Sequence, residues 1–173
     1  MGIKRGFDVV VSLVGLIILM PVFVVMAVLI GITMGGPVFF SQTRIGRYGR
    51  PFRIIKFRTM QVDEDELVIT IKNDRRITST GAFLRRYRLD ELPQLWNVLT
   101  GEMSLVGPRP DVPGYADKLT GDDRQILTLR PGIHVSTQFL VGYKNHSIYD
   151  YWQKTERGVG TIDFFFSSLF KNN

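Results

Sequence analysis

The 173-residue chain is long enough to bury one hydrophobic core, and its 22 lysines and arginines exceed its 16 acidic residues, giving a formal charge of +6. This excess suits partners that carry phosphate, such as nucleic acid, anionic lipid or a sugar nucleotide. The absence of cysteine excludes disulfides and thiolate metal sites, and two histidines argue against a zinc site. A cation held by carboxylate oxygens is not excluded.

An uncharged segment runs from Val9 to Met34, and its 26 residues are enough to cross a bilayer. Pro21 lies near its centre, where it removes a helical hydrogen bond. Basic residues flank both ends, Lys4 and Arg5 before the segment and a series from 44 to 58 after it, which conflicts with the positive-inside rule for a single span. The residues leave two arrangements open: a crossing helix, and a re-entrant helix that breaks at Pro21 and returns to the same face.

A β-hairpin is predicted after the apolar segment. Short β-prone runs at 38–40 and 52–57 flank a turn that contains Gly46, Gly49 and Pro51. The arginines of this turn form either a solvated face or a contact with anionic lipid. Farther on, Thr80 is predicted to cap an amphipathic helix whose arginine-rich side suits the headgroup layer of a membrane.

Two adjacent carboxylates, Asp90 and Glu91, precede an apolar pattern of helical spacing that runs from Leu92 to Leu99. Asp90 is expected at the N-cap of this helix and Pro93 in its first turn. Backbone N–H groups there stabilise negative charge, either of Asp90 itself or of a bound phosphate. Taken alone, the pair favours an ordinary cap followed by a first-turn glutamate.

Three prolines between 108 and 113 predict a rigid turn that aims Arg109. An arginine on such a turn can clamp a phosphate through two parallel hydrogen bonds, or it can pair with a surface carboxylate. The run from Asp122 to Leu129 is predicted to be helical and to end at Arg130-Pro131-Gly132.

The chain contains several long motifs, and their sequences and order resemble those of the monotopic phosphoglycosyl transferases, also called bacterial sugar transferases. The resemblance extends from the apolar N-terminus to about Gln138. After Ile133 the chain departs from the family pattern and retains only this glutamine. The motifs are Lys56-Phe57-Arg58-Thr59-Met60, Leu89-Asp90-Glu91-Leu92-Pro93-Gln94-Leu95-Trp96-Asn97, Gly107-Pro108-Arg109-Pro110 and Arg130-Pro131-Gly132-Ile133.

The resemblance implies an enzyme that moves a sugar-1-phosphate from a UDP-sugar to a polyprenyl (undecaprenyl) phosphate. Asp90 would be the nucleophile, would carry a phosphosugar–aspartyl intermediate and would release UMP. It is also the expected ligand of a Mg²⁺ ion, and Glu91 would act as a general base or as metal or structural support. The expected contacts of the substrate are Lys56, Arg58, Arg85, Arg109, Arg130 and Gln138.

The expected fold is α+β and mainly helical, with a re-entrant membrane hairpin at 1–36 and a catalytic domain at 37–173 on the cytoplasmic face of the bacterial inner membrane. Amphipathic helices are expected to lie at the interface, and the aromatic residues of the tail to form an interfacial belt or core packing. Expected partners are the two substrates, the bilayer and a possible second copy, but not nucleic acid. The alternative is a non-catalytic adaptor that binds anionic lipid. The sequence leaves the identity of the sugar open.

Overall fold

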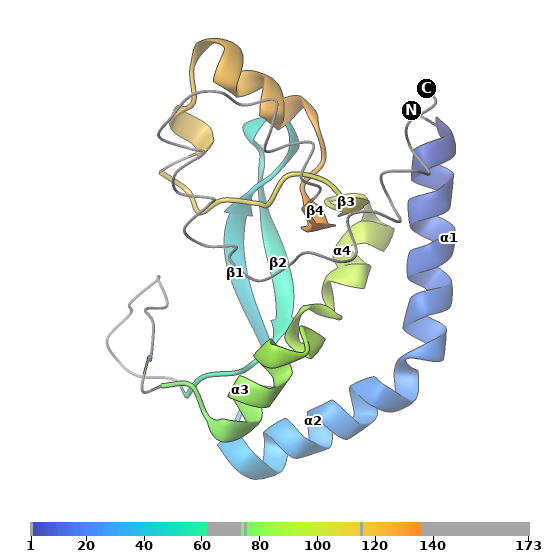
Figure 1. Ribbon diagram of the computed structural model, residues 1–173, viewed down its shortest axis with the longest axis vertical. Helices are drawn as coiled ribbons and strands as arrows, with labels where there is room; N and C mark the ends of the chain where they lie inside the picture. The colour runs from blue at the N-terminus through green and yellow to red at the C-terminus, as the bar shows by residue number, and fades with distance from the viewer. Residues whose placement is uncertain (1, 62–73, 75, 115, 136–173) are drawn as a thin grey trace.

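The computed structural model describes residues 2–61, 74, 76–114 and 116–135, and within them the fold is α+β, as predicted (Figure 1). Figure 1 shows α1 and α2 forming an L that follows one side and one end of a long β-hairpin, with α4 between the hairpin and α1. The regular elements are α1 (Gly2–Ile18), α2 (Met20–Met34), β1 (Phe39–Ile45), β2 (Pro51–Phe57), α3 (Ser79–Arg86), α4 (Gln94–Thr100), β3 (Ser104–Val106) and β4 (Gly132–His134), with 3₁₀ turns η1 (Arg47–Gly49), η2 (Leu89–Glu91), η3 (Ala116–Lys118) and η4 (Gly121–Thr128).

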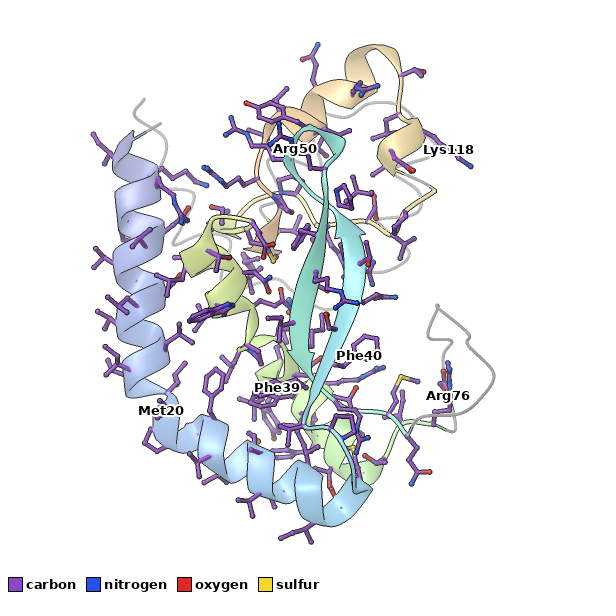
Figure 2. All side chains as sticks on the ribbon, turned by 180° about the vertical axis from the view of Figure 1, so that it is seen from behind. Met20, Phe39, Phe40, Arg50, Arg76 and Lys118 are labelled. Carbon is purple, nitrogen blue, oxygen red and sulfur yellow. The ribbon has the colours of Figure 1, made fainter. Side chains whose placement is uncertain are left out.

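The apolar segment forms two helices that meet at a 60° bend. The break falls at Leu19, beside the Met20 labelled in Figure 2, and Pro21 lies in the first turn of α2. A proline there cannot donate to the carbonyl of Ile17, so the α1 hydrogen-bond ladder stops just before it. The predicted break at Pro21 is thus displaced by two residues. Neither helix alone is long and apolar enough to cross a bilayer, whereas the two taken together meet that test.

One side of α1 is polar and is fixed to the rest of the chain. Arg5 donates from its two terminal nitrogens to the carbonyls of Val98 and Leu99, at 2.5 and 2.9 Å, and so caps the end of α4. Asp8 accepts a 2.8 Å hydrogen bond from the hydroxyl of Ser104. The other side of α1 is an exposed apolar surface, made by Phe7, Val10, Val11, Leu13, Val14, Ile17 and Ile18.

The predicted hairpin is confirmed, and all seven residues of β1 pair with β2 in antiparallel register. The free edge of β2 is occupied by one side chain, the amide of Asn97 on α4, which is 1% exposed. Its oxygen accepts from the N–H of Ile55 at 3.1 Å, and its nitrogen donates to the carbonyl of Arg53 at 2.8 Å and to the carboxylate of Glu102 at 2.7 Å. Asn97 therefore fixes α4 against the hairpin in one register.

The turn that leads into α3 is capped by a different residue from the one predicted. The side chain of Thr78, not that of Thr80, accepts a 3.0 Å hydrogen bond from the N–H of Gly81. Gly81 itself lies so close to the preceding segment that a Cβ there would meet the carbonyl oxygen of Thr59 at 1.9 Å. The start of α3 is therefore pressed against Thr59, and the boundary predicted from the sequence is two residues late.

A second, two-stranded sheet brings the Gly107 and Gly132 segments together in parallel. The two backbones cross closely enough that a Cβ on Gly132 would lie 2.1 Å from the nitrogen of Gly107. Between the strands, the helix predicted at 122–129 is a 3₁₀ helix, η4, at Gly121–Thr128. The buried apolar residues form three clusters: one joins α2 and α3 around Phe57, one joins β2 and α4 around Val98, and one joins β1 and η4 around Ile45.

We predict that Asn97→Ala lowers the free energy of unfolding by about 3 kcal/mol, because it leaves a donor and an acceptor of the β2 edge buried without partners. Chemical unfolding of the full chain in detergent measures this change. Thr100→Ala is the matched control on the same helix, since its hydroxyl bonds to the carbonyl of Asn97 and not to the hairpin. Equal losses in the two variants would contradict a special role for the Asn97 amide.

Candidate active site

Asp90 lies in η2, the 3₁₀ turn between α3 and α4 (Figure 1). The chain reaches this turn through Arg88, which adopts the left-handed conformation with φ 55° and ψ 22°. That conformation costs an arginine about 1 kcal/mol and separates the end of α3 from η2. Because α4 begins only at Gln94, Asp90 does not cap that helix, and Pro93 precedes the helix instead of lying in its first turn. The predicted N-cap is therefore wrong.

Asp90 is only 9% exposed, and its neighbours act on its pKa in opposite directions. Burial raises the pKa of Asp90, and the adjacent Glu91 raises this pKa further, whereas Lys56 and Arg85 lower it. Two of the predicted substrate-binding cations are thus close enough to act on the predicted nucleophile. The Lys56 ammonium also forms a 3.1 Å ion pair with the carboxylate of Glu91.

Arg85 is held by one of its nitrogens, which leaves the rest of the guanidinium available. Its Nε donates to the buried hydroxyl of Thr59 at 2.8 Å. Within the described part of the chain its two terminal nitrogens make no hydrogen bond. A guanidinium oriented in this way beside a carboxylate is suited to hold phosphate oxygens.

The other predicted phosphate contacts lie elsewhere. Arg58 is 6% exposed and donates to the carbonyl of Gly35, where α2 ends, so it joins that helix to the hairpin. Arg130 donates from Nε to the carbonyl of Gly101, just beyond α4, at 2.9 Å. Arg109 lies with Asp111 at a third place, and Gln138 falls outside the described residues, as do His146 and the aromatic tail.

Three residues of interest were missed by the sequence analysis. Gln94 is 2% exposed and lies between Glu91 and Asn97, and its side-chain nitrogen has no hydrogen-bond partner among the described residues. The signal that could have identified Gln94 was its place in the longest motif.

The other two missed residues are Asp111 and Arg44. Burial raises the pKa of Asp111, and Arg44 and then Arg109 lower it. Nothing in the local sequence links Arg44 with Asp111, because their contact depends on the hairpin.

The described residues contain no group of three or more histidine, aspartate or glutamate side chains that could hold a metal ion by themselves. The donor set at the site is the pair Asp90 and Glu91. One or two carboxylates are what Mg²⁺ takes from a protein when substrate phosphates and water complete its six ligands. The residues therefore fit a cation that binds together with a phosphorylated substrate.

Three relatives of this chain have names that specify transfer of a sugar phosphate and undecaprenyl phosphate. A putative undecaprenyl-phosphate N-acetylgalactosaminyl 1-phosphate transferase of Bacillus subtilis is 43% identical over 124 residues, which are 70% of this chain and 69% of the relative. The UDP-glucose:undecaprenyl-phosphate glucose-1-phosphate transferase of Escherichia coli is 48% identical over 110 residues, 62% of this chain and 24% of the relative. The third relative is the UDP-N-acetylgalactosamine-undecaprenyl-phosphate N-acetylgalactosaminephosphotransferase of Aeromonas hydrophila. It is 39% identical over 149 residues, which are 82% of this chain and 34% of the relative.

The chain thus spans only about a quarter to a third of the two longer relatives. The family description "Bacterial sugar transferase" matches residues 1–159, nearly the whole chain and all of the site described above. The chain belongs to the bacterial sugar transferase family.

Proposed function

We propose that this chain transfers a sugar-1-phosphate from a UDP-sugar to a polyprenyl phosphate, undecaprenyl phosphate in a bacterium. The observation that carries the proposal is the pairing of a buried aspartate with cations: Asp90 lies among Lys56, Arg85 and Glu91. The names of the relatives, which specify UDP-sugars and undecaprenyl phosphate, support the two substrates.

In the first half-reaction, an oxygen of the Asp90 carboxylate attacks the β-phosphorus of the UDP-sugar. The bond from that phosphorus to the bridging oxygen breaks, and the electron pair leaves with UMP. The sugar phosphate is then bound to the enzyme as an acyl phosphate. In the second half-reaction, an oxygen of the polyprenyl phosphate attacks the same phosphorus and releases the Asp90 carboxylate.

The difficulty of the first step is electrostatic, because a carboxylate must approach a pyrophosphate of the same sign. The burial of Asp90 removes hydrating water from the nucleophile, and the positive charges of Lys56 and Arg85 offset the repulsion. Asp90, together with Glu91, would hold a Mg²⁺ ion that neutralises further phosphate charge. The ion pair between Glu91 and Lys56 keeps both groups beside the reacting carboxylate.

The bent helix pair supports a membrane-bound enzyme. Its outward side is a continuous set of exposed apolar residues on both helices, which on α2 are Met20, Val24, Val25, Val28, Leu29 and Ile32. A surface of this kind is stable in lipid and unfavourable in water. We place the pair as a re-entrant hairpin in the cytoplasmic face of the inner membrane, because the 60° bend and the basic residues on both sides fit an element that enters and leaves on one face.

Asp90→Asn is expected to abolish both half-reactions, because the amide keeps the shape of the side chain and lacks its nucleophilic charge. UMP release should fall by on the order of 10⁴ or more. Intact-protein mass spectrometry after incubation with a UDP-sugar should find no phosphosugar adduct. Glu91→Gln removes the neighbouring carboxylate, and if Glu91 serves only the second half-reaction, this variant should accumulate the adduct on Asp90 when it is given UDP-sugar without lipid. Steady turnover by Asp90→Asn, or an adduct mapped to Glu91, would overturn the assignment of the nucleophile.

Removal of divalent cations is expected to stop UMP release, and addition of MgCl₂ should restore it, since the site offers oxygen ligands and the chain has no thiols. A coupled assay of UMP after dialysis against EDTA measures this dependence. The unfolding transition of the dialysed protein is the control, and it should stay unchanged if the cation acts in the reaction alone. Full turnover after exhaustive chelation would exclude the proposed role of the cation.

The topology is testable with single cysteines, because the chain contains none. Ile3→Cys and Arg50→Cys place thiols at two exposed positions, in the first turn of α1 and at the far end of the hairpin. A re-entrant pair keeps both positions in the cytoplasm, so an impermeant maleimide should label neither in intact cells and both after permeabilisation. Labelling of position 3 alone in intact cells would show that the segment crosses the membrane.

A further inference from the structure

Gln94 is a buried side chain that the proposed mechanism does not use. It is 2% exposed, and its side-chain nitrogen makes no hydrogen bond within the described part of the chain. Buried amide donors in folded proteins nearly always have an acceptor, because an unpaired donor keeps the full cost of leaving water. A buried donor without an acceptor, next to a reacting group, is therefore a candidate for a contact that is made during the reaction.

The turn that carries Asp90 continues directly into α4. Leu92 and Pro93 both have helical dihedral angles, so η2 and α4 form one continuous helical path. Residues three or four apart in such a path lie on the same side of it. Asp90 is four residues before Gln94 and both are buried, whereas Trp96, on the other side, is 53% exposed. Asp90 and Gln94 therefore lie on the buried side of the path, one turn apart.

The buried side of this path is fixed to β2 both before and after Gln94. Three residues before it, Glu91 forms the 3.1 Å ion pair with Lys56 of β2. Three residues after it, the amide of Asn97 bonds to the edge of the same strand. Gln94 lies between these two contacts along the path, so its amide is enclosed between the helix and the strand, close to the turn that carries Asp90.

The carboxylate of Asp90 has few donors of its own. Within the described residues it accepts a hydrogen bond from its own backbone N–H and from no other group. The neighbouring carboxylate of Glu91, by contrast, already accepts from Lys56. Glutamine and aspartate side chains one helical turn apart form hydrogen bonds with each other. The donor of Gln94 and the acceptor of Asp90 are thus complementary.

We infer that the side-chain nitrogen of Gln94 donates a hydrogen bond to the carboxylate of Asp90 as this group leaves the phosphorus in the second half-reaction. This inference rests on the proposed function. When an oxygen of the polyprenyl phosphate attacks, the bond between the phosphorus and the Asp90 oxygen breaks. The electron pair of that bond returns to the carboxylate, which regains its full negative charge. A fixed donor bonds more strongly to this group as the charge develops, so it lowers the barrier.

The two half-reactions should therefore depend on Gln94 to different extents. In the first, Asp90 starts with its full charge and loses charge during the attack. A hydrogen bond to it is strongest before the transition state and gives no acceleration. In the second, the charge on Asp90 increases toward the transition state, and the same hydrogen bond accelerates the step.

The test is Gln94→Met in the full chain, because methionine has a similar length and helix preference but no donor. The adduct on Asp90 is first formed with a UDP-sugar and then mixed with polyprenyl phosphate, and intact-protein mass spectrometry follows both steps. The rate at which the adduct decays should fall by about 10²-fold. The rate at which it forms should change by less than about threefold. Gln61→Met, which removes the amide of an exposed glutamine, is the matched control and should leave both rates unchanged.

The unfolding transition of the same variant separates this role from a purely structural one. If the amide served only the fold, for example by bonding to the edge of β2, Gln94→Met would lower the midpoint of unfolding. We expect the midpoint to stay unchanged or to rise, because the substitution removes a buried donor that has no acceptor. A lower midpoint, a failure to fold, equal losses in the two half-reactions or an unchanged decay of the adduct would each overturn the inference. The proposed function fails separately, if the unmodified chain forms no phosphosugar adduct on Asp90.

Discussion

The described structure depends on one amide group. Asn97 satisfies the exposed edge of β2 with its own donor and acceptor, which a neighbouring strand would otherwise have to do. Through that contact α4 acquires a fixed position, and with it the turn that carries Asp90 and the helix end that receives Arg5. The turn that carries Asp90, the hairpin and α1 are thus all positioned by the same few hydrogen bonds.

The site contains both the groups that disfavour the ionised form of Asp90 and the groups that favour it. A carboxylate that is buried beside a second carboxylate favours its protonated form, as the raised pKa of Asp90 shows. Lys56 and Arg85 act against this tendency, and they approach from two different elements, β2 and α3. Since Lys56 also binds Glu91, the loss of any one of these charges would disturb the other three.

The sequence predicts the local features of this fold well and its long-range contacts poorly. The hairpin was predictable because β-prone runs flank glycines and a proline, and the helix break because Pro21 lacks a donor. The start of α4 at Gln94 could not be predicted, because Leu92 already has helical dihedral angles and the change from a 3₁₀ turn to an α-helix depends on packing. Contacts such as that of Asp8 with Ser104, 96 residues apart, leave no periodic signal at all. Asn97 was quoted as part of a motif, but its role requires knowledge of which strand edge faces it.

The crossing of Gly107 and Gly132 has a consequence for how such a chain can diversify. The two backbones meet at van der Waals limits, so residues 108–131 form an excursion that leaves and re-enters the fold at nearly one point. Apart from η3 and η4, which pack against Ile45 of β1, such a segment can change length at small entropic cost. Asp90, Lys56 and Arg85 all lie outside, whereas Arg109 and Asp111 lie inside. Sequence changes between residues 108 and 131 can therefore accumulate without displacing the carboxylates and cations around Asp90.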